Sequence, residues 1–202
     1  MRELTRRKFI GIVPAILATS ALPARAYENS DDPYTLPALN MSKFPQEVRR
    51  TVVTYRTRQF PGTIIIDTAD KHLFLVLEGG KAIRYGVAVG KDGYRWGGAA
   101  DIGRKVMWPR WTPPKDMIER KPELSKWRNG MPGGPENPLG ARALYLFQNG
   151  RDTLYRIHGT NDPASIGKAA SSGCIRMFNQ DVVDLYRRAP IGSRVLVYTE
   201  GL

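Results

Sequence analysis

Short strand-like segments follow one another closely in the first half of the chain, and this spacing constrains the fold most. Thr63–Thr68 is a β-branched run, His72–Glu78 is an apolar run, and apolar residues alternate over Ala82–Val89. Gly79-Gly80 separates the second segment from the third, and such a pair is typical of a tight hairpin turn. Three strands joined by short turns predict an antiparallel meander in a mainly β domain.

Residues 91–140 break this pattern, because they are rich in Gly, Pro and Trp and lack regular periodicity. We expect one short helix there, at Lys115–Lys121. A long irregular insert in a compact domain is typically a lid or a binding loop. Regular structure is expected to resume in strands at Ala141–Gln148, Thr153–His158 and Arg194–Thr199, and in a helix at Asp181–Arg188 with Asn179 as its N-cap. The predicted fold is a sandwich-like or barrel-like β domain with a long loop insert and short helices.

The first 26 residues have the organisation of an export signal. Four basic residues among the first nine precede an apolar run over Ile10–Leu22, and Ala24-Arg25-Ala26 follows. This order predicts a cleaved secretory signal peptide at residues 1–26. Thr5-Arg6-Arg7-Lys8 is similar to the start of a twin-arginine export signal, which we favour over a Sec signal and over an uncleaved anchor.

Charge and composition indicate where the protein acts and which cofactors and partners it needs. The 202-residue chain has a formal net charge of +12, and an exported basic protein meets anionic envelope polymers rather than nucleic acid. A single cysteine excludes an internal disulfide, and two histidines weigh against a zinc site of the Cys/His kind. We expect no metal and no organic cofactor, a periplasmic or cell-envelope location, and membrane contact only during export.

The candidate chemistry lies in residues 157–177. His158 ends a predicted strand, and Cys174 follows sixteen residues later, directly after Ser171-Ser172-Gly173. A thiol of ordinary pKa is only a few per cent thiolate at pH 7, so it needs a neighbouring base such as His158 to act as a nucleophile. The amides of Gly173 and Cys174, at the start of an expected helical turn, would hold an oxyanion. The carbonyl of Gly159 would fix the imidazole tautomer.

Ile157-His158-Gly159-Thr160 and Ser171–Met177 together resemble the signature of the L,D-transpeptidase catalytic domain, the YkuD or ErfK family. In that family His-Gly-Thr is followed by Ser-His-Gly-Cys-Ile-Arg-Met. Further similarity is carried by Pro61-Gly62-Thr63, His72–Val76, Val87–Lys91, Asn137–Gly140 and Ile166-Gly167. The resemblance implies a catalytic domain at residues 61–200, preceded by an extended lead-in at residues 27–60.

The resemblance also implies a role for each residue of the motif. Cys174 would be the acyl-accepting nucleophile, His158 its base, and Gly159 the residue that orients the imidazole through its carbonyl. The remaining site residues would be Ser172 and Gly173 as amide donors to the oxyanion, with Ser171 and Arg176 lining the substrate site. Ser172 stands where the family usually has a histidine, so the chain lacks that second imidazole.

Two residue-level questions stay open in the sequence. Arg176 either binds a substrate carboxylate or pairs with Asp181 or Asp184. Trp96, Trp108 and Trp111 either form a platform for stacking sugars or pack beneath the long loop.

The function implied by the resemblance is that of a peptidoglycan L,D-transpeptidase. The thiol would attack the bond between the third residue of a donor stem peptide and its terminal D-alanine. The acyl group would then pass to an amine acceptor, either a neighbouring stem peptide, giving a 3–3 cross-link, or a lysine of an envelope protein. The alternatives are a cell-wall carboxypeptidase or endopeptidase that uses the same Cys–His pair, and a non-catalytic wall-binding module. Papain-like hydrolases usually place cysteine before histidine, which is the reverse of the order here.

Overall fold

The computed structural model describes residues 32–91, 96–171 and 173–199, so the expected signal peptide at 1–26 lies outside the described residues. The strands are β1 (Thr51–Thr54), β2 (Ile64–Asp67), β3 (His72–Leu77), β4 (Lys81–Gly86), β5 (Val89–Gly90), β6 (Gly98–Met107), β7 (Arg142–Gln148), β8 (Arg151–His158), β9 (Ala169–Ser171), β10 (Ile175–Arg176) and β11 (Arg194–Tyr198). The helices are α1 (Lys115–Arg120) and α2 (Asn179–Arg188), with short 3-10 turns at η1 (Met41–Lys43), η2 (Gln46–Val48), η3 (Pro122–Trp127) and η4 (Pro163–Ser165). Within the described ranges, no helix is both long enough and apolar enough to cross a membrane.

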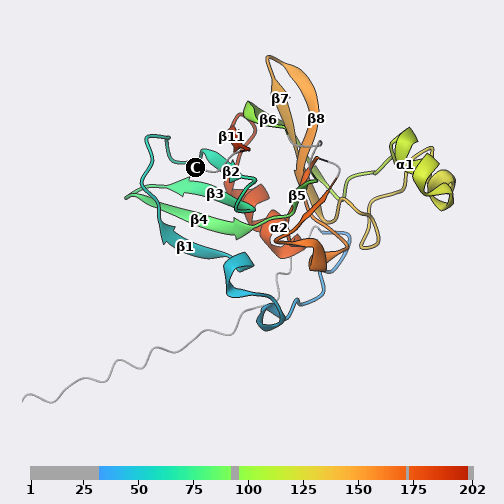
Figure 1. Ribbon diagram of the computed structural model, residues 1–202, viewed down its shortest axis with the longest axis horizontal. Helices are drawn as coiled ribbons and strands as arrows, with labels where there is room; N and C mark the ends of the chain where they lie inside the picture. Colours follow the sequence, from blue (N-terminus) through green and yellow to red (C-terminus); the bar gives the residue numbers. More distant parts are fainter. Residues whose placement is uncertain (1–31, 92–95, 172, 200–202) are drawn as a thin grey trace, which may run out of the picture.

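Most of the described strands belong to one mixed sheet with the order β1-β4-β3-β2-β11-β6-β7-β8-β10, and β5 pairs with β9 separately (Figure 1). The predicted antiparallel meander is present as β2, β3 and β4. Gly79 and Gly80 join β3 to β4 with φ of 69° and 67°, the left-handed region that a tight hairpin turn of this kind requires. The expected mainly β domain with short helices is confirmed.

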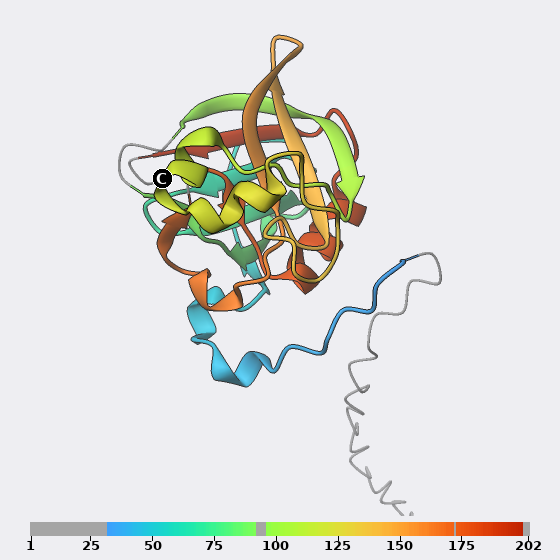
Figure 2. The ribbon, with the colours of Figure 1, turned by 90° about the vertical axis from the view of Figure 1, so that its right-hand side faces the viewer.

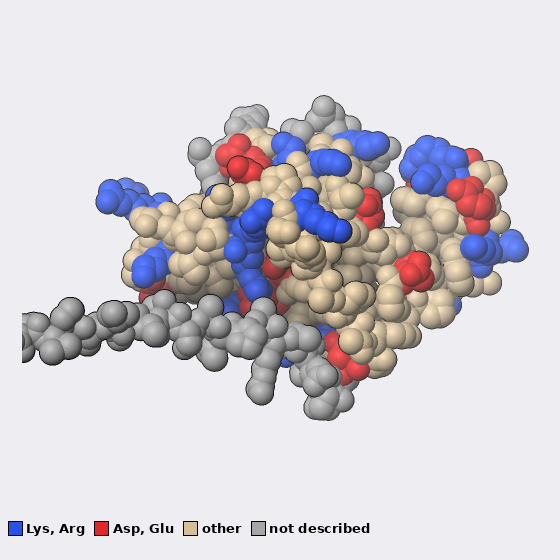
Figure 3. Space-filling model, turned by 90° about the horizontal axis from the view of Figure 1, so that it is seen from below, with Lys and Arg blue, Asp and Glu red and all other residues tan. Residues whose placement is uncertain are grey.

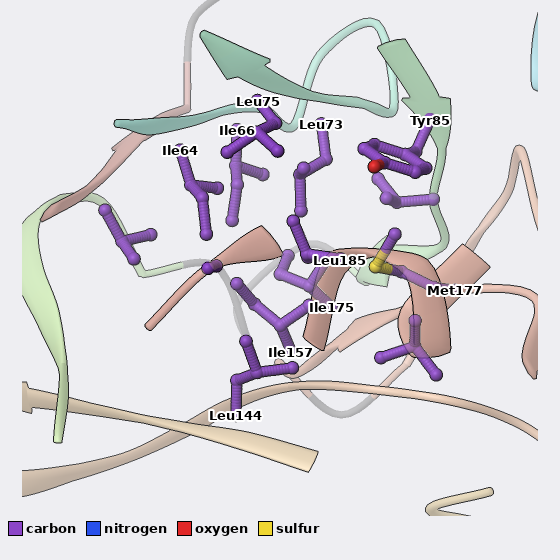
Figure 4. Packing of buried hydrophobic residues seen from close by; sticks show 14 of the residues in the cluster. Ile64, Ile66, Leu73, Leu75, Tyr85, Leu144, Ile157, Ile175, Met177 and Leu185 are labelled. Carbon is purple, nitrogen blue, oxygen red and sulfur yellow. The ribbon is translucent and has the colours of Figure 1, made fainter. Parts of the chain in front are cut away.

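The sheet curls so that its two halves enclose one core. Side chains of Ile64 and Ile66 on β2 point across the core toward Leu144 on β7 and Ile157 on β8 (Figure 4). All four are fully buried. Leu185 of α2 packs into the same cluster, so the helix closes the core beside the strands that carry the candidate site.

Strand β6 corrects the sequence interpretation, which placed its ten residues in an irregular insert. Only Ala100 and Ile102 of this strand are fully buried, so the alternating apolar pattern of a half-buried strand is missing. The strand forms because β11 and β7 pair with it on either side. The irregular part of the insert therefore begins after Met107.

The remaining insert stands off one end of the sheet as a lobe that carries α1 (Figures 1 and 2). Its base is closed where the Trp108 amide donates to the Ala141 carbonyl at 2.8 Å and where Trp111 pairs with Met131. The short helix expected at Lys115–Lys121 is confirmed as α1. This lobe overhangs the ends of β8 and β10 and supplies one wall of the cleft described below.

The lead-in ahead of residue 61 is fastened to the domain. The Asp32 carboxylate binds the guanidinium of Arg142 on β7 and accepts a hydrogen bond from the Trp108 indole. The Arg142 and Asp32 side chains are only 2% and 7% exposed, so this ion pair is buried. Burial acts to raise the pKa of Asp32, but the hydrogen bonds from Arg142 and Trp108 and the Arg142 charge outweigh it and hold the pKa below its usual value. The Tyr34 ring packs edge-on against Trp108 at 4.8 Å.

Candidate active site

Parallel pairing of β8 and β10 brings the two halves of the sequence motif together. His158 at the end of β8 lies opposite Arg176 on β10, and the Met177 amide donates to the His158 carbonyl at 2.8 Å. Cys174 immediately precedes β10. His158, Cys174 and Arg176 all line one cleft of about 520 Å³, so the structure brings together the sequence-predicted pair at an accessible surface.

The His158 imidazole is held in one tautomer. Its Nδ1 lies 2.6 Å from the carbonyl oxygen of Gly159, and because a carbonyl only accepts, Nδ1 carries the proton. Burial lowers the pKa of His158 to about 4, and the charges of Arg176 and Arg156 act in the same direction, while the carbonyls of Gly159 and Leu139 oppose it. At neutral pH the ring is therefore uncharged, and Nε2 is its unprotonated nitrogen.

The Cys174 side chain is half-buried and lines the cleft. Burial raises its pKa, although the backbone amide of Arg156 and the charges of Arg156 and Arg176 act to lower it. The sulfur lies 4.0 Å from the carbonyl of Leu154 on β8. Leu154 has a φ of 65°, a left-handed conformation that is rare for a branched side chain. These pKa shifts favour a protonated thiol and a neutral imidazole in the same cleft at neutral pH.

The turn before the cysteine is shaped by Ser171. Its hydroxyl donates to the Cys174 carbonyl at 2.5 Å and accepts a hydrogen bond from the Gly173 amide at 3.1 Å. Gly173 has a φ of 116°, which explains why glycine is needed there. The prediction of a helical turn after the cysteine was wrong, because strand β10 follows Cys174 and α2 begins only at Asn179. Ser172 lies outside the described residues.

Arg176 faces the cleft and is not an ion-pair partner of α2. The acids proposed as its alternative partners, Asp181 and Asp184, are instead bound by Arg50 of the lead-in, at 3.7 and 3.1 Å. Asp184 also binds Arg188 at 3.0 Å. Burial lowers the pKa of Arg176, while the charge of Asp162 partly compensates. The guanidinium is therefore left facing the cleft, which favours a substrate-binding role.

Much of the cleft wall comes from the insert, and the sequence did not show which of its residues would reach the site. The apolar lining residues that the insert contributes include Trp111, Leu124, Trp127, Met131, Pro138 and Leu139. Trp108 lies elsewhere, buried against Asp32, and Trp96 stacks on Tyr155 at 5.4 Å. The three tryptophans therefore do not form one sugar-stacking platform. Within the described ranges, no group of three His, Cys, Asp or Glu side chains is placed to hold a metal ion.

Asn179 supports the catalytic loop and is not a helix cap. Phe178 occupies the N-cap position of α2, and Asn179 is the first helical residue. The Asn179 Oδ1 accepts from the amides of Ala141 and Thr160 at 2.9 and 3.2 Å, and its Nδ2 donates to the Thr160 carbonyl at 2.9 Å. A Cβ on Gly159 would lie 2.1 Å from Asn179 Oδ1, so only glycine fits beside it. Nothing in the local sequence revealed this role, because its partners are distant along the chain.

Comparison with known proteins places this site in a family. The family model of the L,D-transpeptidase catalytic domain, YkuD, matches residues 61–197. A putative L,D-transpeptidase of Fuscovulum blasticum is 31% identical over 173 residues, which is 80% of this chain and 86% of that protein. The chain therefore belongs to the L,D-transpeptidase catalytic-domain family. It spans 38% to 43% of the length of several other curated relatives.

Solved structures share the fold. L,D-transpeptidase 3 of Mycobacterium tuberculosis is 13% identical with a TM-score of 0.50, covers 67% of this chain and 60% of its own, and shows the fold alone. A Brucella melitensis protein described as a probable carnitine operon oxidoreductase is 50% identical with a TM-score of 0.53, and the match covers 79% of this chain and 99% of that one.

Proposed function

We propose that this protein is a peptidoglycan L,D-transpeptidase that works through a thioester on Cys174. The sulfur attacks the carbonyl carbon of the third residue of a donor stem peptide, and the bond to the terminal D-alanine breaks. The thiol proton passes to Nε2 of His158 and from there to the amine of the departing D-alanine. An acceptor amine then attacks the thioester, which forms a new amide and returns the proton to the sulfur.

The observation that carries this proposal is the shared cleft of Cys174 and His158, with Nδ1 of the imidazole bonded to Gly159. A neutral imidazole with its proton on Nδ1 can accept a proton only at Nε2. A thiol with a raised pKa keeps its proton until the attack, so deprotonation and bond formation are coupled. Gly159 and Asn179 are positioning residues in this scheme, because they hold the ring and its loop without touching substrate.

The developing oxyanion is proposed to lie against the backbone amides of Gly173 and Cys174. In the resting structure the Gly173 amide donates to the Ser171 hydroxyl, so the Cys174 amide is the primary donor in this proposal. Arg176 is proposed to bind a carboxylate of the stem peptide from the adjoining wall of the cleft.

The proposed setting is the periplasm, reached by a cleaved N-terminal signal of the twin-arginine type. The support is the basic start, the apolar run over Ile10–Leu22 and the small residues ending at Ala26. Amino-terminal sequencing of protein recovered from the envelope fraction should find a chain that starts at Tyr27. A chain that retains Met1 after export would contradict cleavage.

Intact-mass measurement tests the reaction directly. Purified protein incubated with a disaccharide tetrapeptide should gain the mass of the substrate less one D-alanine, and addition of a tripeptide amine should release a 3–3 linked product. Cys174→Ser should form no thioester, and His158→Gln should slow acylation by at least about a hundredfold. Acyl transfer that persists in Cys174→Ser would overturn the proposal. Exclusive transfer to water would redirect it to a carboxypeptidase that uses the same pair.

A further inference from the structure

A second cavity, of about 420 Å³, opens beside the catalytic cleft and shares a wall with it. Both cavities are lined by Met117, Lys121, Ser171 and Arg176. The second cavity adds Lys91, Arg120 and Ala170. We call this second cavity the cationic arm, because four of its seven lining residues are Lys91, Arg120, Lys121 and Arg176, and none is acidic.

Four parts of the fold converge to build the cationic arm. Lys91 directly follows β5, Ala170 and Ser171 belong to β9, and Arg176 belongs to β10. The opposite wall is one face of α1 and its C-cap, where residues 117, 120 and 121 have the three- and four-residue spacing that places side chains together. Figure 3 shows the lobe that carries α1 set off from the body of the molecule by a hollow, with Lys and Arg side chains on its surface. The arm therefore exists only because the insert faces the sheet.

The cations of the arm form few ion pairs with the described residues. Among the ion pairs of the described residues, Arg120 alone of these four cations takes part, binding Asp116 on its own helix at 2.8 Å. That pair is exposed on both sides and contributes little. Arg176 is half-buried and forms no close ion pair in the described ranges, although the charge of Asp162 acts on it from farther away. A converging set of cations, one of them partly desolvated, is suited to bind an anionic ligand.

The position of the arm relative to the nucleophile limits which anion it reaches. Ser171 borders the arm and its hydroxyl contacts the Cys174 carbonyl at 2.5 Å. Arg176 is two residues beyond Cys174, roughly 6 to 7 Å along an extended chain. An extended ligand covers the same distance in about two residues. A group in the arm is therefore one or two residues from a carbonyl held at the sulfur.

We propose that the cationic arm binds a free carboxylate of the donor stem peptide, one or two residues from the bond that is cleaved, and so selects free-acid stems over amidated stems. This rests on the proposed function, since it names the substrate feature that the same site recognises. Three carboxylates of a stem satisfy the distance: the α-carboxylate of a γ-linked second residue, the side-chain carboxylate of the third residue, and the terminal carboxylate. Arg176 and Lys121 contact it where arm and cleft meet, and Lys91 lies farther in.

The experiment compares four tetrapeptide donors: the free acid and three peptides that each carry one of these carboxylates as an amide. Acylation of the full chain is followed by intact mass, and kcat and KM are obtained for each donor. We expect one amide to raise KM about tenfold with little change in kcat, which identifies the carboxylate. Lys91→Gln and Lys121→Gln should each raise KM for the free acid about fivefold and leave KM for that amide unchanged. Added salt should weaken the preference.

Lys115→Gln is the matched control, because it removes one positive charge from the same helix at a residue that lines neither cavity. It should leave the preference intact. The proposal is overturned if all four donors acylate with the same KM, or if Lys91→Gln and Lys121→Gln act no more on the free acid than Lys115→Gln does. Failure of the proposed function looks different, because wild-type protein would then form no thioester with any donor.

Discussion

The neutral resting state of Cys174 and His158 makes a quantitative prediction for alkylation of the thiol. With a His158 pKa of about 4, about one imidazole in a thousand is protonated at pH 7, so a stable thiolate–imidazolium pair is not populated. An unperturbed thiol with a pKa of 9.0 is about 1% thiolate at that pH, and burial of Cys174 lowers this fraction further. The thiolate fraction, and with it the alkylation rate, should rise about tenfold per pH unit between pH 6 and 8.

The assay is simple because the chain has a single cysteine. The pseudo-first-order rate of iodoacetamide addition is followed by intact mass at half-unit steps from pH 5 to 9. The urea-unfolded chain serves as the control, and it should react faster at every pH because its thiol has an ordinary pKa. A rate that is flat between pH 5 and 8 would refute the reasoning, since it would require a preformed thiolate beside a charged imidazole.

Three further predictions concern the groups that support the site. Asp32→Asn leaves the buried Arg142 charge without its partner and should lower the free energy of unfolding by about 3 to 5 kcal/mol in urea titrations. Asp116→Asn breaks an exposed pair and should lower it by under about 1 kcal/mol. Similar losses in the two variants would contradict this prediction. Asn179→Ala leaves three backbone groups unpaired and should lower the free energy of unfolding by about 2 to 3 kcal/mol. It should also slow acylation, measured by intact mass after the reaction is stopped at timed intervals. An unchanged acylation rate would leave Asn179 with a purely structural role. Burial raises the pKa of Asp181 from 3.8 to about 6, so ionisation of this carboxyl destabilises the fold as pH rises through that window. The free energy of unfolding of Asp181→Asn, relative to wild type, should therefore increase by about 3 kcal/mol between pH 3.5 and pH 8. A difference that does not depend on pH would show the shift to be absent.

The parts of the fold that sequence reasoning predicted are those with local causes. The β2–β3–β4 meander follows from consecutive apolar runs and from the Gly79-Gly80 turn, whose conformation only a few residue types adopt. The Cys–His pair was predicted because one short segment holds both residues, and the structure places both in one cleft beside the paired strands β8 and β10. Both features can be predicted from a short stretch of sequence without knowledge of the rest of the chain.

The parts that were missed have distant causes. β6 has only two fully buried residues, so its own sequence does not predict a strand. It forms because β7 and β11 pair with it. Asn179 was interpreted as a cap because Asn favours that position, but its hydrogen bonds reach residues 141 and 160. The cationic arm likewise depends on where α1 faces, which no local pattern records.

The ion pair of Asp32 and Arg142 joins residues that are 110 positions apart. Strand β2 pairs in parallel with β11, which is the last strand of the described chain. Loop closure on this scale comes late and slowly in folding. During synthesis on the ribosome, β2 therefore waits for β11 until the chain is nearly complete. A shortened chain that begins at residue 61 would lack Asp32 and would fold with the Arg142 guanidinium missing its ion-pair partner.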